Sequence, residues 1–167
     1  MDIIIERAKR ADAVEVLQYL KAIGGETDNL SFGSEGLPFT QESEAEYLAQ
    51  IEKSCDEIML VAKKNKKIIG SATLSRLPRR MKHRGELSVS VLREYWNQGI
   101  GSWLLDEIIR FAQDYSFDVI DLQVRSDNAS AVHLYQKFGF IKIGTHPHFF
   151  KIENEQIPFD YMCLTIR

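Results

Sequence analysis

Hydrophobic and polar positions along this chain follow two different periods. Short runs rich in β-branched and aliphatic residues predict strands, and these runs are residues 3–7, 58–62, 67–74, 85–91, 119–124, a stretch beginning at 140, and 159–166. Segments in which apolar residues recur every three or four positions predict helices; they follow Asp12 and Thr40, lead from the glycine turn at 99–101 to about 115, and cover 128–138. The predicted order is therefore β-α-α-β-β-β-α-β-α-β-β.

The two N-terminal helices carry expectations about their buried faces. The first is expected to bury one face, which comprises Val14, Leu17, Leu20 and Ile23. The glycine pair 24–25 is expected to end this helix. The second helix, capped near Thr40, is expected to bury Tyr47, Leu48 and Ile51. The element order predicts one α/β domain over residues 1–167, with a mixed, largely antiparallel sheet of six or seven strands and helices on both faces.

Charge and composition narrow the function classes. The chain carries 21 Lys and Arg against 24 Asp and Glu, a net charge of −3, which argues against nucleic acid as a partner. No apolar run approaches the roughly 20 residues of a membrane span, and the N-terminus reads as a strand rather than a signal peptide. Cys55 and Cys163 match no metal or redox spacing, so a cytoplasmic location is expected. The basic stretch 63–67 predicts a hairpin turn, whereas 79–84 predicts a turn or a basic rim near an anionic ligand.

The most informative segment leads from the strand 85–91 through a glycine turn into a helix. Free N–H groups and the positive end of the dipole at a helix start bind phosphate oxygens, and Gly99 and Gly101 have no Cβ to block the anion. A P-loop would need a lysine where Ser102 stands. A dinucleotide fold would need a small residue in place of Leu104 and would carry the turn in its first βα unit. The segment therefore predicts a different pyrophosphate ligand.

Two blocks of sequence together resemble the GNAT superfamily of acyl-CoA N-acyltransferases. The first, Tyr95-Trp96-Asn97-Gln98-Gly99-Ile100-Gly101, resembles the family's pyrophosphate loop, Arg/Gln-x-x-Gly-x-Gly/Ala. The second lies within residues 124–140 and resembles Asn-x-x-Ala-x-x-Leu-Tyr-x-Lys-x-Gly-Phe, beginning at Asn128. The element order fits the family over nearly the whole chain. The resemblance implies acetyl-CoA as co-substrate.

The resemblance also implies roles for residues on the cofactor side. The pyrophosphate is expected on a loop and first helical turn formed by Asn97, Gln98, Gly99, Ile100, Gly101 and Ser102. Val89 and Val91 are expected to line the pantetheine arm with main-chain groups while their side chains pack in the core. Asn128 is expected both to cap a helix and to bond the cofactor arm. Trp96 stands where the family usually has Arg or Gln, so one side-chain contact is expected to be lost.

Acyl transfer from a thioester needs an acid for the departing thiolate and a base for the incoming ammonium. The resemblance assigns the acid to Tyr135, for which core packing is the other interpretation, and the N–H near Val91 is expected to polarise the thioester carbonyl. Some relatives carry a glutamate base where Gln123 stands, and an amide cannot take up the proton. Glu86 on the preceding strand is the expected substitute, directly or through water; substrate recognition or simple exposure are its alternatives.

The acceptor side gives weaker signals. In the family the loop after the first helix often shapes the acceptor pocket, so Glu26, Asp28 and Phe32 are expected to suit a cationic amine with an apolar body; an ordinary surface loop fits equally well. His146 and His148 have no Cys or carboxylate at metal-ligand spacing. We therefore expect no metal, and we expect these histidines in a loop over the acceptor site.

These observations predict an enzyme that moves an acetyl group from acetyl-CoA to a primary amine by direct attack in a ternary complex, without a covalent intermediate. The acceptor is a small molecule or a peptide or protein amine. A non-catalytic CoA-binding sensor is the alternative, and Gln123 in the base position keeps it open. Monomer and homodimer both fit, and the sequence does not name the acceptor or the preferred acyl chain.

Overall fold

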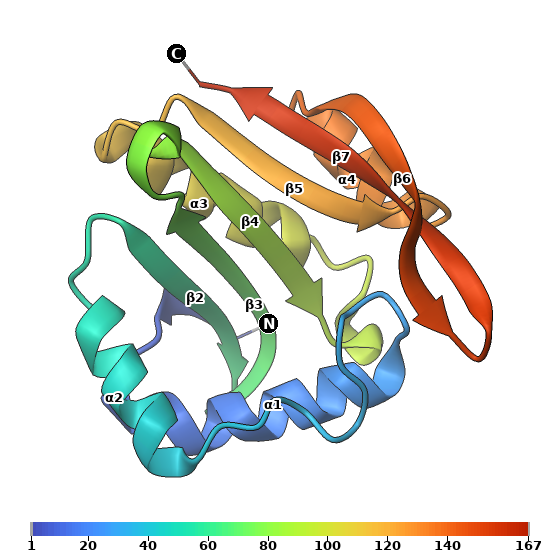
Figure 1. The fold of residues 1–167 in the computed structure, drawn as a ribbon. Helices are drawn as coiled ribbons and strands as arrows, with labels where there is room; N and C mark the ends of the chain where they lie inside the picture. The colour runs from blue at the N-terminus through green and yellow to red at the C-terminus, as the bar shows by residue number, and fades with distance from the viewer. Residues whose placement is uncertain (1, 167) are drawn as a thin grey trace.

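The computed structural model describes residues 2–166, which form one seven-stranded sheet with four α-helices around it (Figure 1). The strands are β1 (Ile3–Arg7), β2 (Glu57–Lys64), β3 (Lys67–Arg76), β4 (Arg84–Val91), β5 (Val119–Arg125), β6 (Ile141–Ile152) and β7 (Glu155–Thr165). The helices are α1 (Ala13–Glu26), α2 (Gln41–Ile51), α3 (Ile100–Asp114) and α4 (Ala129–Lys137), with short 3₁₀ turns η1 (Arg10–Asp12), η2 (Arg79–Met81) and η3 (Arg93–Tyr95). The predicted fold class and element order are confirmed.

The helices cover the two faces of the sheet unequally. In Figure 1, α1 and α2 lie across β1–β4 on the near face, whereas α3 and α4 lie behind the sheet. β2 and β3 each bury five consecutive residues, as expected for strands covered on both faces. Leu104, Leu105 and Ile108 of α3 are fully buried beneath this half of the sheet. The core lies under β1–β4 and continues beneath β5 and β7, where Ile120, Leu122 and Met162 are buried. In Figure 1 no helix covers the near face of β5–β7–β6.

The strands β4 and β5 form the single parallel pairing of the described sheet, and this pairing is short. Arg84–Glu86 pair with Val119–Asp121, and the two strands then continue without pairing further. β4 pairs with β3 along its whole length, and the Leu92 N–H donates to a β3 carbonyl at 2.9 Å. In antiparallel strands every second residue bonds the same neighbour, so the even-numbered residues of β4 bond β3, as Leu92 does. The main-chain N–H and C=O groups of the odd-numbered residues therefore point toward β5. The main-chain groups of Val89 and Val91 therefore point into a gap between two strands.

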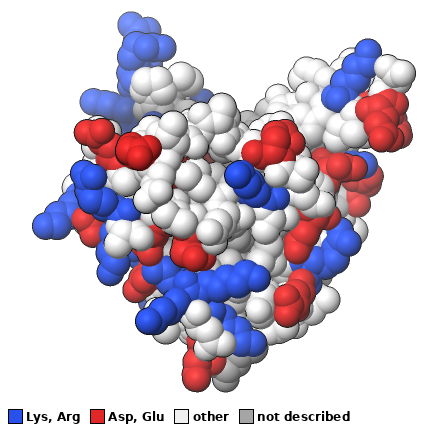
Figure 2. All heavy atoms as spheres, turned by 90° about the horizontal axis from the view of Figure 1, so that it is seen from below, with Lys and Arg blue, Asp and Glu red and all other residues white. Residues whose placement is uncertain are grey.

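The hairpin of β6 and β7 forms the far edge of the sheet. β6 is the outermost strand and most of its residues are exposed. The segment containing His146 and His148, expected as a loop, lies within β6 next to an irregularity in the pairing with β7. Pro147 is tolerated there because an edge strand has N–H positions without a neighbour. Figure 2 shows the hairpin tip projecting from the body, and it shows basic and acidic side chains interspersed over this face.

The buried face of α1 differs from the predicted one. The helix buries Val16, Tyr19 and Ile23, whereas Val14 is 41% exposed. A helical stripe through Tyr19 fits the 3.6-residue period as well as a stripe through the aliphatic residues alone, because a tyrosine is largely apolar. In α2 the opposite holds: Tyr47 is expected to be buried but is 38% exposed.

The glycine pair 24–25 does not end α1, because the helix continues through Glu26. A Cβ on Gly24 would lie 2.1 Å from the carbonyl oxygen of Gly33. This glycine is therefore needed for the close approach of the following loop to the helix. The loop of residues 27–40 consequently lies tight against the C-terminal end of α1.

Candidate active site

A cleft of about 360 Å³ lies where β4 and β5 separate. Most of the predicted site residues line it, namely Glu26, Val89, Val91, Asn97, Gly99, Ile100, Gly101, Ser102, Asn128 and Tyr135. Four predicted residues lie outside the lining: Asp28, Phe32, Glu86 and Gln98. Residues from both faces of the sheet meet here, because the gap between the two strands opens a passage through it.

One end of the cleft is the start of α3. Gly99 lies immediately before the helix with φ +81°, and Asn97 also has a positive φ of 60°. The first N–H groups of a helix have no intrahelical partner, so those of Ile100 and Ser102 are directed at this end. Gly101 brings α3 against α4, because a Cβ there would lie 3.3 Å from Leu134. The predicted helix start and its glycine turn are thus where an anion would be held.

Trp96 has a structural role that the sequence did not reveal. Its indole Nε1 donates to the carbonyl oxygen of Val91 at 2.7 Å, which ties the loop to the open edge of β4. The Arg93 guanidinium lies over the indole ring at 5.6 Å. The hydrogen bond from Trp96 satisfies the Val91 carbonyl and leaves the N–H groups of Val89 and Val91 facing the gap.

Helix α4 contributes a second wall of the cleft. Asn128 caps the helix, since its side chain accepts from the Ala131 N–H at 3.2 Å, and it also lines the cleft. Tyr135 is buried against Phe140, yet its hydroxyl has no hydrogen-bond partner among residues 2–166. No fully enclosed side-chain polar atom of these residues lacks a partner, so the hydroxyl reaches the cleft. Burial raises the pKa of Tyr135 to about 12, so it stays protonated and able to donate a proton at neutral pH.

Helix α1 forms the opposite wall. The Tyr19 hydroxyl lies 2.8 Å from the Ser90 Oγ of β4, which lines the cleft. Burial raises the pKa of Tyr19 well above its ordinary value, and the nearby charge of Glu26 adds to this effect. One carboxylate oxygen of Glu26 accepts from the Arg93 N–H at 2.8 Å. Neither Tyr19 nor Ser90 was identified from the sequence, because the two lie 71 positions apart in the chain.

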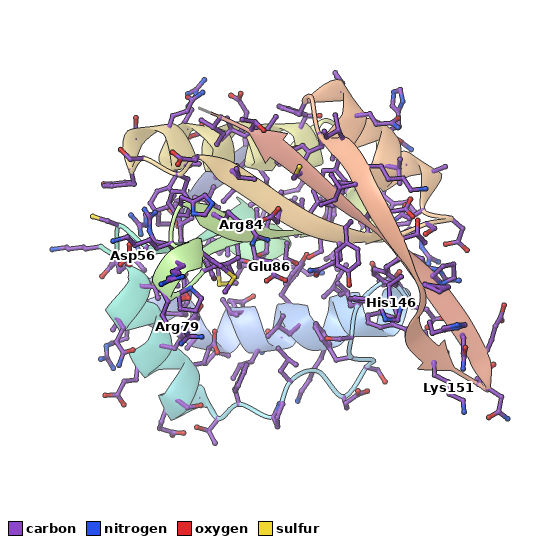
Figure 3. The ribbon with its side chains drawn as sticks, turned by 45° about the horizontal axis from the view of Figure 1, so that its top comes forward. Asp56, Arg79, Arg84, Glu86, His146 and Lys151 are labelled. Carbon is purple, nitrogen blue, oxygen red and sulfur yellow. The ribbon has the colours of Figure 1, made fainter. Side chains whose placement is uncertain are left out.

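The remaining predicted acceptor residues lie farther out. Asp28 is exposed, and Phe32 packs partly against the core near Gly24. Glu86 is exposed on the α1 face of the sheet, where Figure 3 shows it near Arg84. Arg84 itself is paired with Asp121 at 2.7 Å. His146 projects from the hairpin toward the loop that follows α1 (Figure 3).

Asp160 of β7 is another residue that the sequence did not single out. Its Oδ1 accepts from the hydroxyls of Ser126 and Thr145, each at 2.7 Å, and lies 3.6 Å from the Lys142 Nζ. Burial alone would raise the pKa of Asp160, but these hydroxyls and the lysine charge together hold it below its ordinary value of 3.8. Ser126 precedes Asn128 by two positions, so Asp160 fixes the entry to α4 against the hairpin.

Two basic residues of α4 also line the cleft: His133 and Lys137. Their spacing of four positions places them on one helical face, a signal that could have identified them once the helix was predicted. Within residues 2–166 no cluster of three or more His, Cys, Asp and Glu side chains has an arrangement that could hold a metal ion. No helix in the same range is both long and apolar enough to cross a membrane.

Comparison with known proteins agrees with this geometry. Residues 26–140 match the sequence profile of the Acetyltransferase (GNAT) family. The structure of an acetyltransferase of the GNAT family from Streptococcus pneumoniae superimposes with a TM-score of 0.95 at 33% identity, covering 99% of this chain and all of that one. A Salmonella typhimurium protein, yncA, described as a putative acetyltransferase with its cofactor acetyl-CoA, shares the fold at a TM-score of 0.85 and 18% identity, covering 100% of this chain and 95% of that one.

Among curated sequences, the N-alpha-acetyltransferase RimI of Mycobacterium tuberculosis is 34% identical over 86 residues, which is 51% of this chain and 52% of that protein. An N-alpha-acetyltransferase of Sulfurisphaera tokodaii is 32% identical over 82 residues, 48% of this chain and 49% of that protein. The chain thus spans about half the length of the curated relatives it matches.

Proposed function

The chain belongs to the acetyltransferase (GNAT) family, and from this premise we propose that it transfers an acetyl group from acetyl-CoA to the amino group of a peptide or protein N-terminus. The gap between β4 and β5, which leads from the start of α3 to the Tyr135 hydroxyl, carries the proposal. The names of the sequence relatives, N-alpha-acetyltransferases, support an α-amine as acceptor. A small-molecule amine is the competing acceptor within the same chemistry.

The cofactor would occupy the gap with its phosphates at the start of α3. The helix N-terminus supplies N–H donors and a positive dipole end there. The cofactor-binding residues of this proposal are Val89, Val91, Asn97, Gln98, Gly99, Ile100, Gly101, Ser102 and Asn128. The free N–H groups of Val89 and Val91 are suited to the amide carbonyls of a pantetheine arm, and Asn128 lies at the same wall. Acetyl-CoA contributes the activated acyl group.

The chemistry is direct attack. The amine nitrogen attacks the thioester carbonyl, whose developing negative charge the Val91 N–H stabilises. The carbon–sulfur bond then breaks, and Tyr135 donates its proton to the departing thiolate. Because its pKa is about 12, Tyr135 carries that proton throughout the neutral range. The proposed residues of the acceptor side remain Glu26, Asp28, Phe32 and Glu86. Glu86 would reach the amine through water.

The test is the release of free thiol from acetyl-CoA over a panel of acceptors. The panel holds short peptides with free α-amines, the same peptides blocked at the N-terminus but carrying lysine, and small amines such as polyamines. Turnover with the free α-amine peptides supports the proposal. Turnover confined to lysine or small amines overturns the acceptor class, and tight acetyl-CoA binding without any turnover favours a sensor instead.

A further inference from the structure

The proposed reaction needs a base that takes a proton from the acceptor amine. Gln123 cannot take up a proton, and Glu86 lies outside the cleft. Glu86 precedes Val91 by five positions on an extended strand, a separation of about 17 Å at ~3.4 Å per residue. A side chain at that distance from the proposed carbonyl site needs a chain of waters to act.

Glu26 is placed differently. Of the described residues that line the cleft, it alone carries a carboxylate. Its Oε2 accepts from the Arg93 N–H at 2.8 Å, and Arg93 follows Val91 by only two positions, which span at most about 7 Å. The Arg93 guanidinium also donates to the Glu26 main-chain oxygen, so two contacts fix the end of α1 beside the end of β4. The second carboxylate oxygen, Oε1, has no hydrogen-bond partner among residues 2–166, and Glu26 lines the cleft.

The location of Glu26 relative to Tyr135 also matters. A base must take the proton from the incoming amine, whereas the acid must reach the sulfur that leaves on the other side of the carbonyl carbon. Glu26 comes from α1 on one face of the sheet and Tyr135 from α4 on the other, and both line the same cleft. His133, the one imidazole of the described cleft lining, shares α4 with Tyr135 and lies on the acid side.

We propose that Glu26 is the catalytic base of this acyltransferase. This inference rests on the function proposed above. Its Oε1 accepts a proton from the acceptor ammonium, directly or through one water, and the freed nitrogen lone pair forms the carbon–nitrogen bond. The carbon–sulfur bond breaks with its electron pair on sulfur, which Tyr135 protonates. The second proton lost by nitrogen as the amide forms restores Tyr135, and the proton on Glu26 returns to solvent.

The experiment compares Glu26→Gln with Glu86→Gln. A glutamine at 26 keeps the oxygen that accepts from the Arg93 N–H but cannot take up a proton. With an α-amine peptide at pH 7, where a share of the amine is charged, we expect kcat/KM of E26Q to fall about 10²–10⁴-fold. E86Q is expected to lose less activity than E26Q, because Glu86 lies outside the cleft and can reach the amine only through water. Acetyl-CoA affinity and thermal stability of E26Q are measured alongside and are expected to match wild type.

The pH dependence separates a base from a residue that only shapes the loop. Raising the pH from 7 to 9.5 deprotonates the peptide amine in solution, so the defect of E26Q is expected to shrink with rising pH. Tyr19 and Arg93 lie next to Glu26. The other titratable or charged side chains of the described cleft lining are Tyr95, His133, Tyr135 and Lys137, and His133→Gln is the control for the imidazole. Glu26→Asp, which withdraws the carboxylate by one methylene, is expected to retain intermediate activity and the wild-type pH dependence.

The outcomes decide separately on the two proposals. Wild-type turnover with an E26Q defect that diminishes at high pH supports Glu26 as the base. Wild-type turnover with a pH-independent E26Q defect, or with the pH-dependent defect in E86Q or H133Q instead, overturns this inference and leaves the acetyltransferase proposal standing. Absence of wild-type turnover with every acceptor overturns both.

Discussion

The two walls of the cleft are built in different ways. On the cofactor side, the loop before α3 and the helix α4 each come from one continuous stretch of chain, and main-chain N–H groups do most of the proposed binding. On the acceptor side, side chains from distant positions meet: Tyr19 reaches Ser90 across 71 residues, and Glu26 reaches Arg93 across 67.

The difference fits what each wall has to recognise. A phosphate group can be held by any helix start with free N–H groups, which requires a backbone shape and a glycine but few particular side chains. An acceptor amine is selected by the charge and shape of individual side chains. Acceptor specificity can therefore change between relatives while the cofactor wall stays the same, because the function depends on the site and not on the fold alone.

The largest effect is expected at Tyr135, the proposed acid. Replacing Tyr135 with Phe removes the hydroxyl while keeping the packing against Phe140, so kcat should fall about 10²–10⁴-fold with little change in acetyl-CoA affinity. Because the Tyr135 pKa is about 12, the wild-type rate should show no loss from this group up to about pH 10. Steady-state kinetics and calorimetric binding check both points. An unchanged kcat would return Tyr135 to a packing role.

The second prediction concerns Asp160, which holds the chain leading into α4 against the β6–β7 hairpin. Asp160→Asn weakens the contacts to Ser126 and Thr145, and we expect a loss of about 1–3 kcal/mol in the free energy of unfolding at pH 7. The pKa of Asp160 is lowered in the folded state, so its stabilisation is full above about pH 5 and is lost as the pH falls through the folded value, below 3.8. Urea unfolding of both proteins between pH 7 and 2.5 should show the difference closing at acid pH. A difference independent of pH would contradict this account.

Gly99 tests the backbone shape of the cofactor wall. At φ +81° an L-residue costs about 1–2 kcal/mol, so Gly99→Ala should lower the melting temperature by a few degrees and weaken acetyl-CoA binding. Gly144→Ala is the matched control, because Gly144 is outside the left-handed region and has open space around its Cβ position. Equal effects of the two substitutions would show that the turn does not need its glycine.

Tyr19 tests the acceptor wall and should give the smallest effect. Tyr19→Phe leaves the Ser90 hydroxyl without its partner, which we expect to cost about 1 kcal/mol of stability and to raise the KM for the acceptor a few-fold without affecting the KM for acetyl-CoA. Tyr47→Phe serves as control, because the Tyr47 hydroxyl bonds Glu57 outside the cleft. A change in the acetyl-CoA KM instead would mean that the two walls are not separate.

The same contrast explains what could be predicted from the sequence. The order of strands and helices follows from local periodicity, and the turn at Gly99 is a local motif, so both could be read directly. The sequence predicts only that Trp96 lacks the side-chain contact of the family's Arg or Gln, whereas the bond from its indole to Val91 is revealed only by the folded loop. The pairs Tyr19–Ser90 and Glu26–Arg93 depend on how α1 packs across the sheet. No local pattern contains that information.

The misplaced predictions have local physical causes as well. The spacing of aliphatic residues predicts a buried Val14, which is exposed. Tyr19 occupies the buried stripe of the helix instead, because its hydroxyl finds a partner in Ser90. The segment of His146 and His148 is expected as a loop but lies in β6, an edge strand that accommodates Pro147. The glycine pair 24–25 predicts a helix end, whereas Gly24 lies inside α1 and allows the close contact with Gly33.

The gap between β4 and β5 makes folding and ligand binding part of one equilibrium. The N–H groups of Val89 and Val91 face a space in which a neighbouring strand would otherwise pair with them. A ligand that bonds these groups acts as the missing strand, and it binds only the folded chain. At a free concentration 100 times its dissociation constant, such a ligand adds about 2.7 kcal/mol to the free energy of unfolding. Under the proposed function acetyl-CoA is such a ligand, and its concentration shifts the equilibrium between the unfolded and the folded chain.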